Sequence, residues 1–117
     1  MQTVAESRAQ GALTAAGHEV ELIGEERRLR ERLEDSATPA VAVLVIDLTN
    51  GNLDGAGIVE SLAGSGERGR PRTLGFYAHV DTPARERAER AGFDLVVPRS
   101  RMAREGAELV TRLAGSS

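Results

Sequence analysis

The feature that most constrains the fold is an uninterrupted apolar run near the middle of the chain. It extends from Val41 to Ile46, is rich in β-branched residues and ends at Asp47. A strand with one face in water alternates apolar and polar residues, and this run does not alternate. Such a run is typical of a strand covered by helices on both faces, as in a parallel sheet. We therefore expect an α/β domain in which Asp47 stands at the carboxyl end of a buried strand.

Helical and strand patterns alternate on both sides of this run. Gly17 and Gly92 are expected to end helices, and Thr82 is expected to be an N-cap with Pro83 at the first helical position. The alternation predicts one domain over residues 1–117, with two helical layers around a mostly parallel sheet of four or five strands. The expected helices are 3–16, 25–33, 55–63, 82–92 and 101–113, and the other expected strands are 19–23, 73–78 and 94–97.

The composition excludes several classes of function. All 15 basic residues are arginines, so Schiff-base and P-loop lysines are excluded. The chain has no cysteine, which excludes disulfides and thiol nucleophiles and favours the cytoplasm. A net charge of −3 argues against nucleic acid as a partner. No apolar run approaches the ~20 residues of a membrane-spanning helix, so no membrane role is expected.

Two segments resemble the receiver domains of bacterial response regulators. The stretch from Asp47 to Gly55 is similar to the phosphoacceptor segment, in which an aspartate ends a buried strand and Asp-Gly follows seven residues on. The stretch from Ala91 to Asp94 is similar to the Ala-Gly-x-Asp segment before the last receiver strand. The resemblance extends from about residue 40 to the C-terminus and implies a three-layer flavodoxin-like fold with the strand order 2-1-3-4-5.

The resemblance breaks at three places that matter for phosphoryl transfer. We expect the first central strand to be missing, with its Mg²⁺-binding acidic pair, because Met1 leads straight into the first expected helix. The small hydroxyl residue that ends the fourth receiver strand aligns with Tyr77, and the lysine of the last strand aligns near Pro98 and Arg99. The resemblance with these losses implies a non-catalytic pseudo-receiver without Mg²⁺ or another cofactor, acting through protein contacts.

The missing strand leaves the segment from Val20 to Ile23 without its usual neighbour. This segment either pairs directly with Val41–Ile46, or a second chain supplies the pairing, or the chain starts too late and omits a native strand. Because bare strand edges invite association, we expect a homodimer. A late start would instead make the protein a genuine receiver that accepts phosphate on Asp47 with Mg²⁺. Besides the pseudo-receiver and the genuine receiver, a third functional alternative is a flavodoxin-like domain that binds a small ligand.

The candidate ligand- or partner-binding residues follow the expected strands, where open α/β sheets place their ligands. The simpler interpretation of Asp47 is a carboxylate that caps the next turn. His79 and Asp81 are more typical of a solvent-facing loop than of a metal site, so no metal site is predicted. Arg99 and Arg101 border the receiver face formed by the last two helices and last strand, and they suit a phosphate or an acidic partner. The full candidate set is Asp47, Asn50, Tyr77, His79, Arg99 and Arg101.

Overall fold

The computed structural model describes residues 2–5, 19–23, 25–34, 42–49, 54–63 and 71–115. They form a five-stranded sheet in the order β2-β1-β3-β4-β5, parallel throughout, which confirms the predicted α/β class. The strands are β1 (Gln2–Ala5), β2 (Glu19–Leu22), β3 (Val43–Asp47), β4 (Arg72–Tyr77) and β5 (Leu95–Pro98). The described helices are α2 (Glu26–Glu34), α3 (Gly55–Ala63), α4 (Thr82–Ala91) and α5 (Arg99–Ala114).

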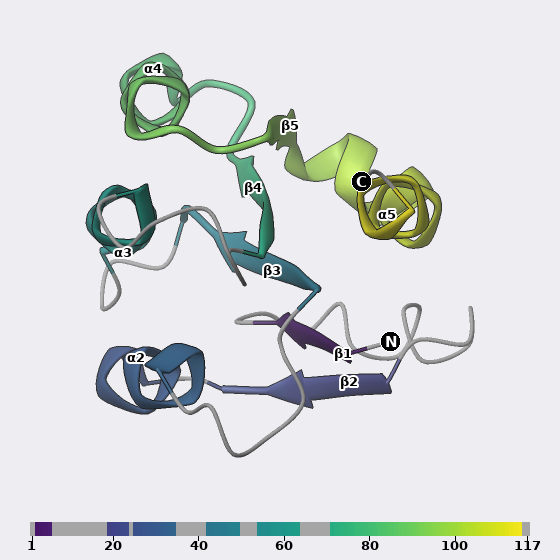
Figure 1. Ribbon diagram of the computed structural model, residues 1–117. Coiled ribbons are helices and arrows are strands. Elements are labelled where there is room, and N and C mark those ends of the chain that lie inside the picture. Colours follow the sequence, from purple (N-terminus) through teal and green to yellow (C-terminus); the bar gives the residue numbers. More distant parts are fainter. Residues whose placement is uncertain are drawn as a thin grey trace.

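Helices cover both faces of the sheet, with α2, α3 and α4 on one side and α5 on the other (Figure 1). Alternate residues of β3 enter the two resulting cores. Val43 and Val45 pack with residues of α5, whereas Leu44 and Ile46 pack with residues of α2, α3 and α4. All four side chains are fully buried. This two-sided burial explains the continuous apolar run, because neither face of β3 meets water.

The N-terminal residues correct the sequence prediction. Gln2–Ala5 form strand β1, not the start of a helix, and β1 lies between β2 and β3. The backbone of Thr3 is in register with Val20 on one side and Val43 on the other. The prediction failed because helically spaced alanines downstream outweighed four strand residues, whereas pairing on both sides fixes these four as extended chain.

The first central strand is therefore present, and the expectation that it is missing is wrong. Direct pairing of Val20–Ile23 with Val41–Ile46 is also wrong, because β1 separates β2 from β3. The homodimer stays a prediction: β2 is paired with β1, and it is still an edge strand of the described sheet. Residues 6–16 of the predicted first helix lie outside the described residues.

The ends of two helices also differ from the prediction. Asp81, not Thr82, is the N-cap of α4, and its side chain accepts the N–H of Ala84 at 3.2 Å. The C-cap of α4 is Gly92, with a left-handed φ of 102°, as predicted. Helix α5 begins at Arg99, two residues earlier than expected, because the extended Pro98 ends β5 and serves directly as its N-cap. None of the described helices has the length and apolarity needed to span a membrane.

The amino ends of β4 and β5 are joined by a partly buried polar contact. One carboxylate oxygen of Asp94 accepts the N–H of Thr73 at 2.7 Å and its hydroxyl at 3.1 Å. The Thr73 hydroxyl oxygen in turn accepts the N–H of Asp94 at 2.9 Å. Thr73 itself is completely buried. Asp94, the last residue of the Ala-Gly-x-Asp segment, therefore holds β4 and the start of β5 together.

Candidate functional site

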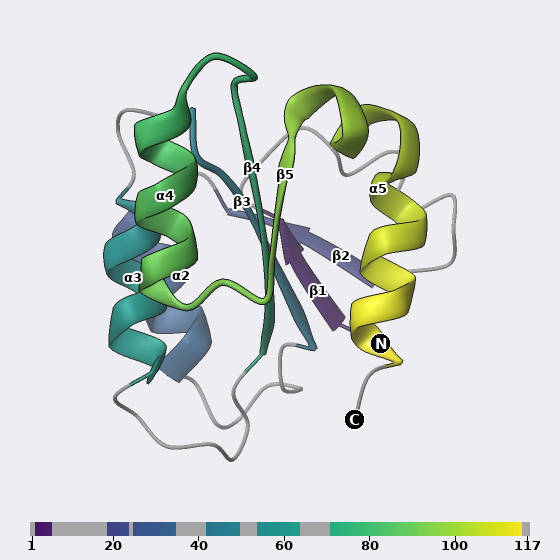
Figure 2. The same cartoon turned by 90° about the horizontal axis from the view of Figure 1, so that it is seen from above.

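The carboxyl ends of β3, β4 and β5 lie along one edge of the sheet. Asp47 is in register with Phe76 of β4, and Tyr77 is in register with Pro98 of β5. Figure 2 shows β4 and β5 turning into α4 and α5 at this edge. We call this region the carboxyl edge. It carries five of the six candidate residues, in strands or just after them: Asp47, Tyr77, His79, Arg99 and Arg101. Asn50 lies outside the described residues.

Asp47 holds the turn that follows β3. Its Oδ1 atom accepts the N–H of Thr49 at 2.8 Å and the Thr49 hydroxyl at 2.5 Å. The N–H of the intervening Leu48 donates to the carbonyl of Phe76 at 2.9 Å, so the turn is also tied to β4. The residue is half-buried. The capping contact considered from the sequence is thus present in the structure.

Tyr77 closes β4 with a large side chain, and only 7% of the residue is exposed. It lies near Arg85 of α4, whose guanidinium donates to Glu89 at 2.8 Å. The hydrogen bond to Glu89 and the Glu89 charge raise the pKa of Arg85 above its ordinary value, and the Tyr77 hydroxyl adds to this effect. The Tyr77 hydroxyl at the end of β4 therefore lies close to the first turn of α4.

The turn between β4 and α4 is exposed. His79 and Val80 lie at its tip, and Val80 is 86% exposed. The N–H of Asp81 donates to the carbonyl of Ala78 at 2.8 Å, and the Asp81 carboxylate is the cap of α4. Within the described ranges, no three histidine or acidic side chains are close enough together to hold a metal ion.

The two arginines at the start of α5 differ in their surroundings. Arg99, the first helical residue, is exposed to solvent. Arg101 is half-buried, and its Nε atom pairs with Glu105 one turn further along the helix at 3.3 Å. The charge of Arg101 is therefore partly balanced within α5, and Arg99 is the more accessible of the two for a partner.

Sequence reasoning missed the role of Asp54. This residue entered only through the Asp-Gly resemblance, but it caps α3 and contacts both α2 and α4. Its position directly before an expected helix was a usable signal, because aspartate is a preferred N-cap. The contact with Arg87 of α4 joins residues that are far apart in the sequence, and no local spacing predicts it.

Comparisons with known proteins identify the fold. No family model matches the chain, and no curated protein sequence is significantly similar. Solved structures do match. The receiver domain of NtrX from Brucella abortus superposes with a TM-score of 0.76 at 17% identity, covering all of both chains. A signal receiver domain from Bermanella marisrubri gives 0.74 at 18% identity, covering 97% of this chain and 96% of its own.

A third similar structure is a response regulator from Burkholderia pseudomallei, described with a phosphorylated aspartic acid, a calcium ion and citrate. Its TM-score is 0.68 at 14% identity, and the match covers 98% of this chain and 65% of that one. At these identities the comparisons speak for the fold alone. Together with the strand order β2-β1-β3-β4-β5, they establish that the chain has the fold of response-regulator receiver domains.

Proposed function

We propose that this chain is a non-catalytic, receiver-like regulatory domain that acts through protein contacts and does not accept a phosphoryl group on Asp47 with Mg²⁺. The observation that carries the proposal is the set of residues at the ends of β4 and β5. β4 ends in the buried ring of Tyr77, and β5 ends in Val97 and Pro98. Neither strand ends in a small hydroxyl or an ammonium group.

Phosphoryl transfer needs positioned cations and a divalent ion to balance the charge that develops. The chain has no lysine, and the rigid fork of an arginine does not replace an ammonium point charge. Mg²⁺ favours octahedral oxygen ligands. Among the described residues of the carboxyl edge, Asp47 is the only carboxylate at a strand end, and its Oδ1 atom already accepts two hydrogen bonds from Thr49. This donor set does not fit Mg²⁺.

The proposed partner surface is the face formed by α4, β5 and α5. Arg99 stands exposed at its border, and α4 presents further exposed charges. A surface of this kind suits a protein partner with acidic groups, because guanidinium groups bind carboxylates with two parallel hydrogen bonds. The partner is a second protein or a second copy of this chain. Sedimentation of the purified protein at increasing concentration tests the second possibility, and a constant monomer mass would exclude it.

One observation favours a second candidate function, a phosphoaccepting receiver. β1 is in its central place beside β3, and the next residue in the sequence after Ala5 is an acidic one, Glu6, which lies outside the described residues. The similar Burkholderia structure is described with a phosphorylated aspartic acid. In this alternative Asp47 accepts the phosphoryl group, and Glu6 supplies one carboxylate where receivers have a pair.

Incubation with acetyl phosphate and Mg²⁺, followed by intact mass measurement, decides between the two candidates. NMR spectra with beryllofluoride and Mg²⁺ provide a second readout. We expect no gain in mass from a phosphoryl group and no change in the amide NMR signal of Thr49. Asp47→Asn is the test variant, and Asp81→Asn is the matched control because Asp81 is a second carboxylate near this edge. A response that Asp47→Asn abolishes and Asp81→Asn preserves would overturn the proposal, and its loss in Glu6→Gln would support the second candidate.

A further inference from the structure

Helices α2 and α3 are equally long but are anchored to the domain very differently. Each has nine residues. α3 buries the apolar side chains of Ala56, Ile58 and Val59 in the core. Among the residues of α2, all of which the structure describes, Leu29 alone is fully buried, and Leu33 is partly buried. Because burial stabilises in proportion to the apolar area removed from water, α2 is the more weakly anchored of the two helices.

The sequence of α2 contributes little helix stability of its own. Apart from Leu29 and Leu33, every residue of α2 is charged. A helix shorter than about 12–15 residues is marginal in water, so its stability comes from packing. The pair between Arg27 and Glu31 lies within the helix, and its side chains are 88% and 63% exposed, so it adds little. The helical state of α2 therefore depends on its contacts with the rest of the domain.

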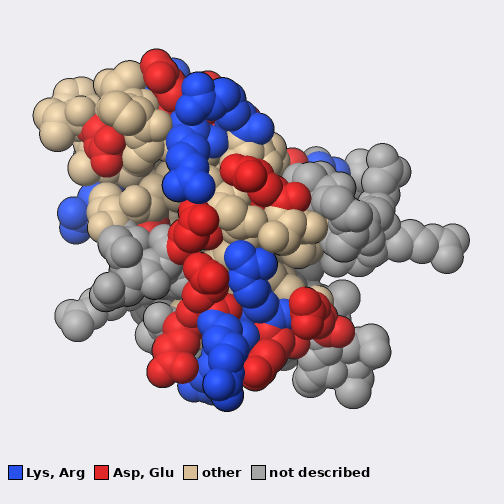
Figure 3. Space-filling model, turned by 90° about the vertical axis from the view of Figure 1, so that its left-hand side faces the viewer, with Lys and Arg blue, Asp and Glu red and all other residues tan. Residues whose placement is uncertain are grey.

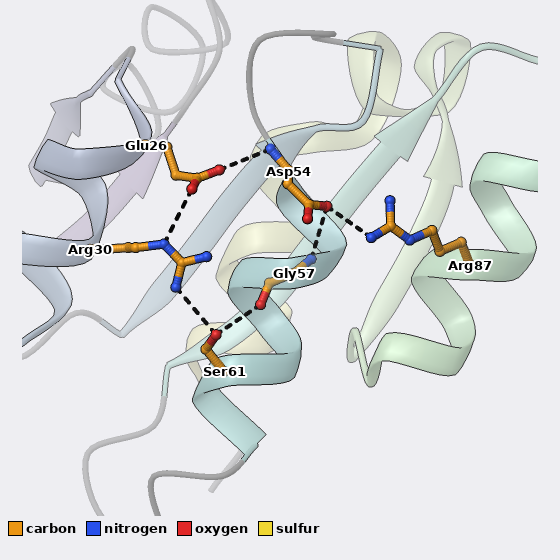
Figure 4. A network of polar contacts seen from close by, with 6 residues as sticks. All are labelled: Glu26, Arg30, Asp54, Gly57, Ser61 and Arg87. Atoms are coloured by element: carbon orange, nitrogen blue, oxygen red, sulfur yellow. Dashed lines mark hydrogen bonds and ion pairs between the residues drawn. The ribbon is translucent and has the colours of Figure 1, made fainter.

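Polar contacts attach α2 to α3 at two points (Figure 4). A carboxylate oxygen of Glu26 accepts the backbone N–H of Asp54, the residue directly before α3, at 3.1 Å. The guanidinium of Arg30 donates to the Ser61 hydroxyl of α3 at 3.2 Å. Glu26 and Arg30 also pair with each other at 3.4 Å, so the two points are linked within α2. We call these two contacts between α2 and α3 the latch.

The latch lies at the surface and is weak. The side chains of Glu26 and Arg30 are 37% and 38% exposed, and Ser61 is also exposed. Figure 3 shows acidic and basic side chains alternating across this face, which α2, α3 and α4 form together. Because water competes for exposed polar groups, loss of one such contact changes a local equilibrium by up to about fivefold. Leu29 and the latch thus hold α2 less firmly than the core holds α3.

We infer that α2 opens as a separate unit, detaching from α3 while the sheet and the other described helices stay folded. α2 lies at the outer end of its helical layer, so it can leave without displacing α4 (Figure 1). Opening takes Leu29 out of the apolar cluster that it shares with Leu44 and Val59, and it exposes that side of the cluster. The inference does not rest on the proposed function, because no contact of Asp47 enters it.

Native-state amide hydrogen exchange tests the inference, because a distant substitution affects separate and global opening differently. Asp94→Ala breaks the contact with Thr73 between β4 and β5, which stays intact when only α2 opens. It should accelerate exchange in β4 and α5 by about thirtyfold and leave exchange in α2 unchanged. Exchange in α2 should also depend less on urea than exchange in α5, since less surface is exposed. Equal acceleration of α2 in Asp94→Ala would show that α2 opens only by global unfolding, and the inference would be wrong.

A variant of the latch gives a second, milder readout. Ser61→Ala removes the acceptor of Arg30 without changing the sequence of α2, and exchange in α2 should accelerate by up to about fivefold. Exchange in α3 should accelerate less, because alanine is the better helix former. Arg28→Gln is the matched control, since it removes an exposed charge of α2 that takes no part in the latch. An effect of Arg28→Gln as large as that of Ser61→Ala, or equal acceleration of α2 and α3 in Ser61→Ala, would contradict the inference.

Discussion

Asp47 and Asp94 make the same pair of contacts in opposite settings. In each case one carboxylate oxygen accepts both the N–H and the hydroxyl of a threonine. Asp94 reaches Thr73 across 21 positions of the sequence and joins two strands at their amino ends. Asp47 reaches Thr49 only two positions away, in an exposed turn at the carboxyl edge.

The two contacts differ in whether water can replace the aspartate as the partner of the threonine. Thr73 is completely buried, so its N–H and hydroxyl have no alternative partner if Asp94 is lost. Thr49 is exposed, and water can take over both of its hydrogen bonds. We infer that the Asp94 contact stabilises the fold and that the Asp47 contact only shapes a turn. Four predictions test this comparison.

The largest effect is expected from Asp94→Ala. It leaves the buried N–H of Thr73 unsatisfied and removes the ion pair to Arg72, so it should lower the free energy of unfolding by about 2–3 kcal/mol. Urea unfolding measures this quantity. Asp47→Ala is the matched control and should cost less than about 1 kcal/mol. Equal costs for the two alanine variants would contradict the comparison.

Gly75→Ala should cost about 1–2 kcal/mol. A β-carbon at this position of β4 would lie 2.9 Å from the ring of Phe93, next to Asp94, and 3.0 Å from Leu48, next to Asp47. The added methyl group therefore crowds residues next to both aspartates, and NMR chemical shifts show which of the two regions changes its structure. We expect the amide signal of Thr49 to shift more than that of Thr73, because the turn at the carboxyl edge is exposed and the Thr73 contact is buried. Gly115→Ala is the control, since its β-carbon would make only ordinary contacts, at 3.5 Å or more.

Thr73→Val separates the hydroxyl from the backbone contact. It keeps the shape of the side chain and the N–H bond to Asp94 but removes the hydroxyl, so unfolding should become easier by about 1 kcal/mol. Thr49→Val removes the equivalent hydroxyl at the carboxyl edge and should change the unfolding free energy by less than about 0.5 kcal/mol. Denaturation of both variants in urea compares them directly, and a reversed order would be evidence against the difference in burial.

The sequence predicted the centre of this fold well because burial on two faces leaves a clear trace. The run that ends at Asp47, the glycine stop at Gly92 and the alternation of elements from β2 onward were predicted correctly from local patterns. β1 was missed because a strand of four residues has little pattern of its own. Its conformation is set by pairing with β2 and β3, which are distant in the sequence.

The candidate site shows the same limit. The parallel topology predicted that Asp47, Tyr77 and Arg99 lie at strand ends along one edge, and the structure places them there. The partners of these residues were harder to predict. Whether Arg87 reaches Asp54, or Arg85 lies near Tyr77, depends on how α4 packs against α3 and β4. Helix packing of this kind has no signature in residue spacing.

The smallest effect is expected from Asp47→Asn. Asparagine keeps an oxygen that accepts from Thr49 and removes only the charge of a half-buried group, so the unfolding free energy should change by less than about 0.5 kcal/mol. The isosteric Asp94→Asn, measured in the same urea series, should cost clearly more because a buried N–H then loses a charged acceptor. If Asp47→Asn proves as costly as Asp94→Asn, the carboxylate is part of the structural framework. If it is neutral, the fold does not require the charge at the end of β3, and any loss of partner binding in this variant reports on the carboxyl edge itself.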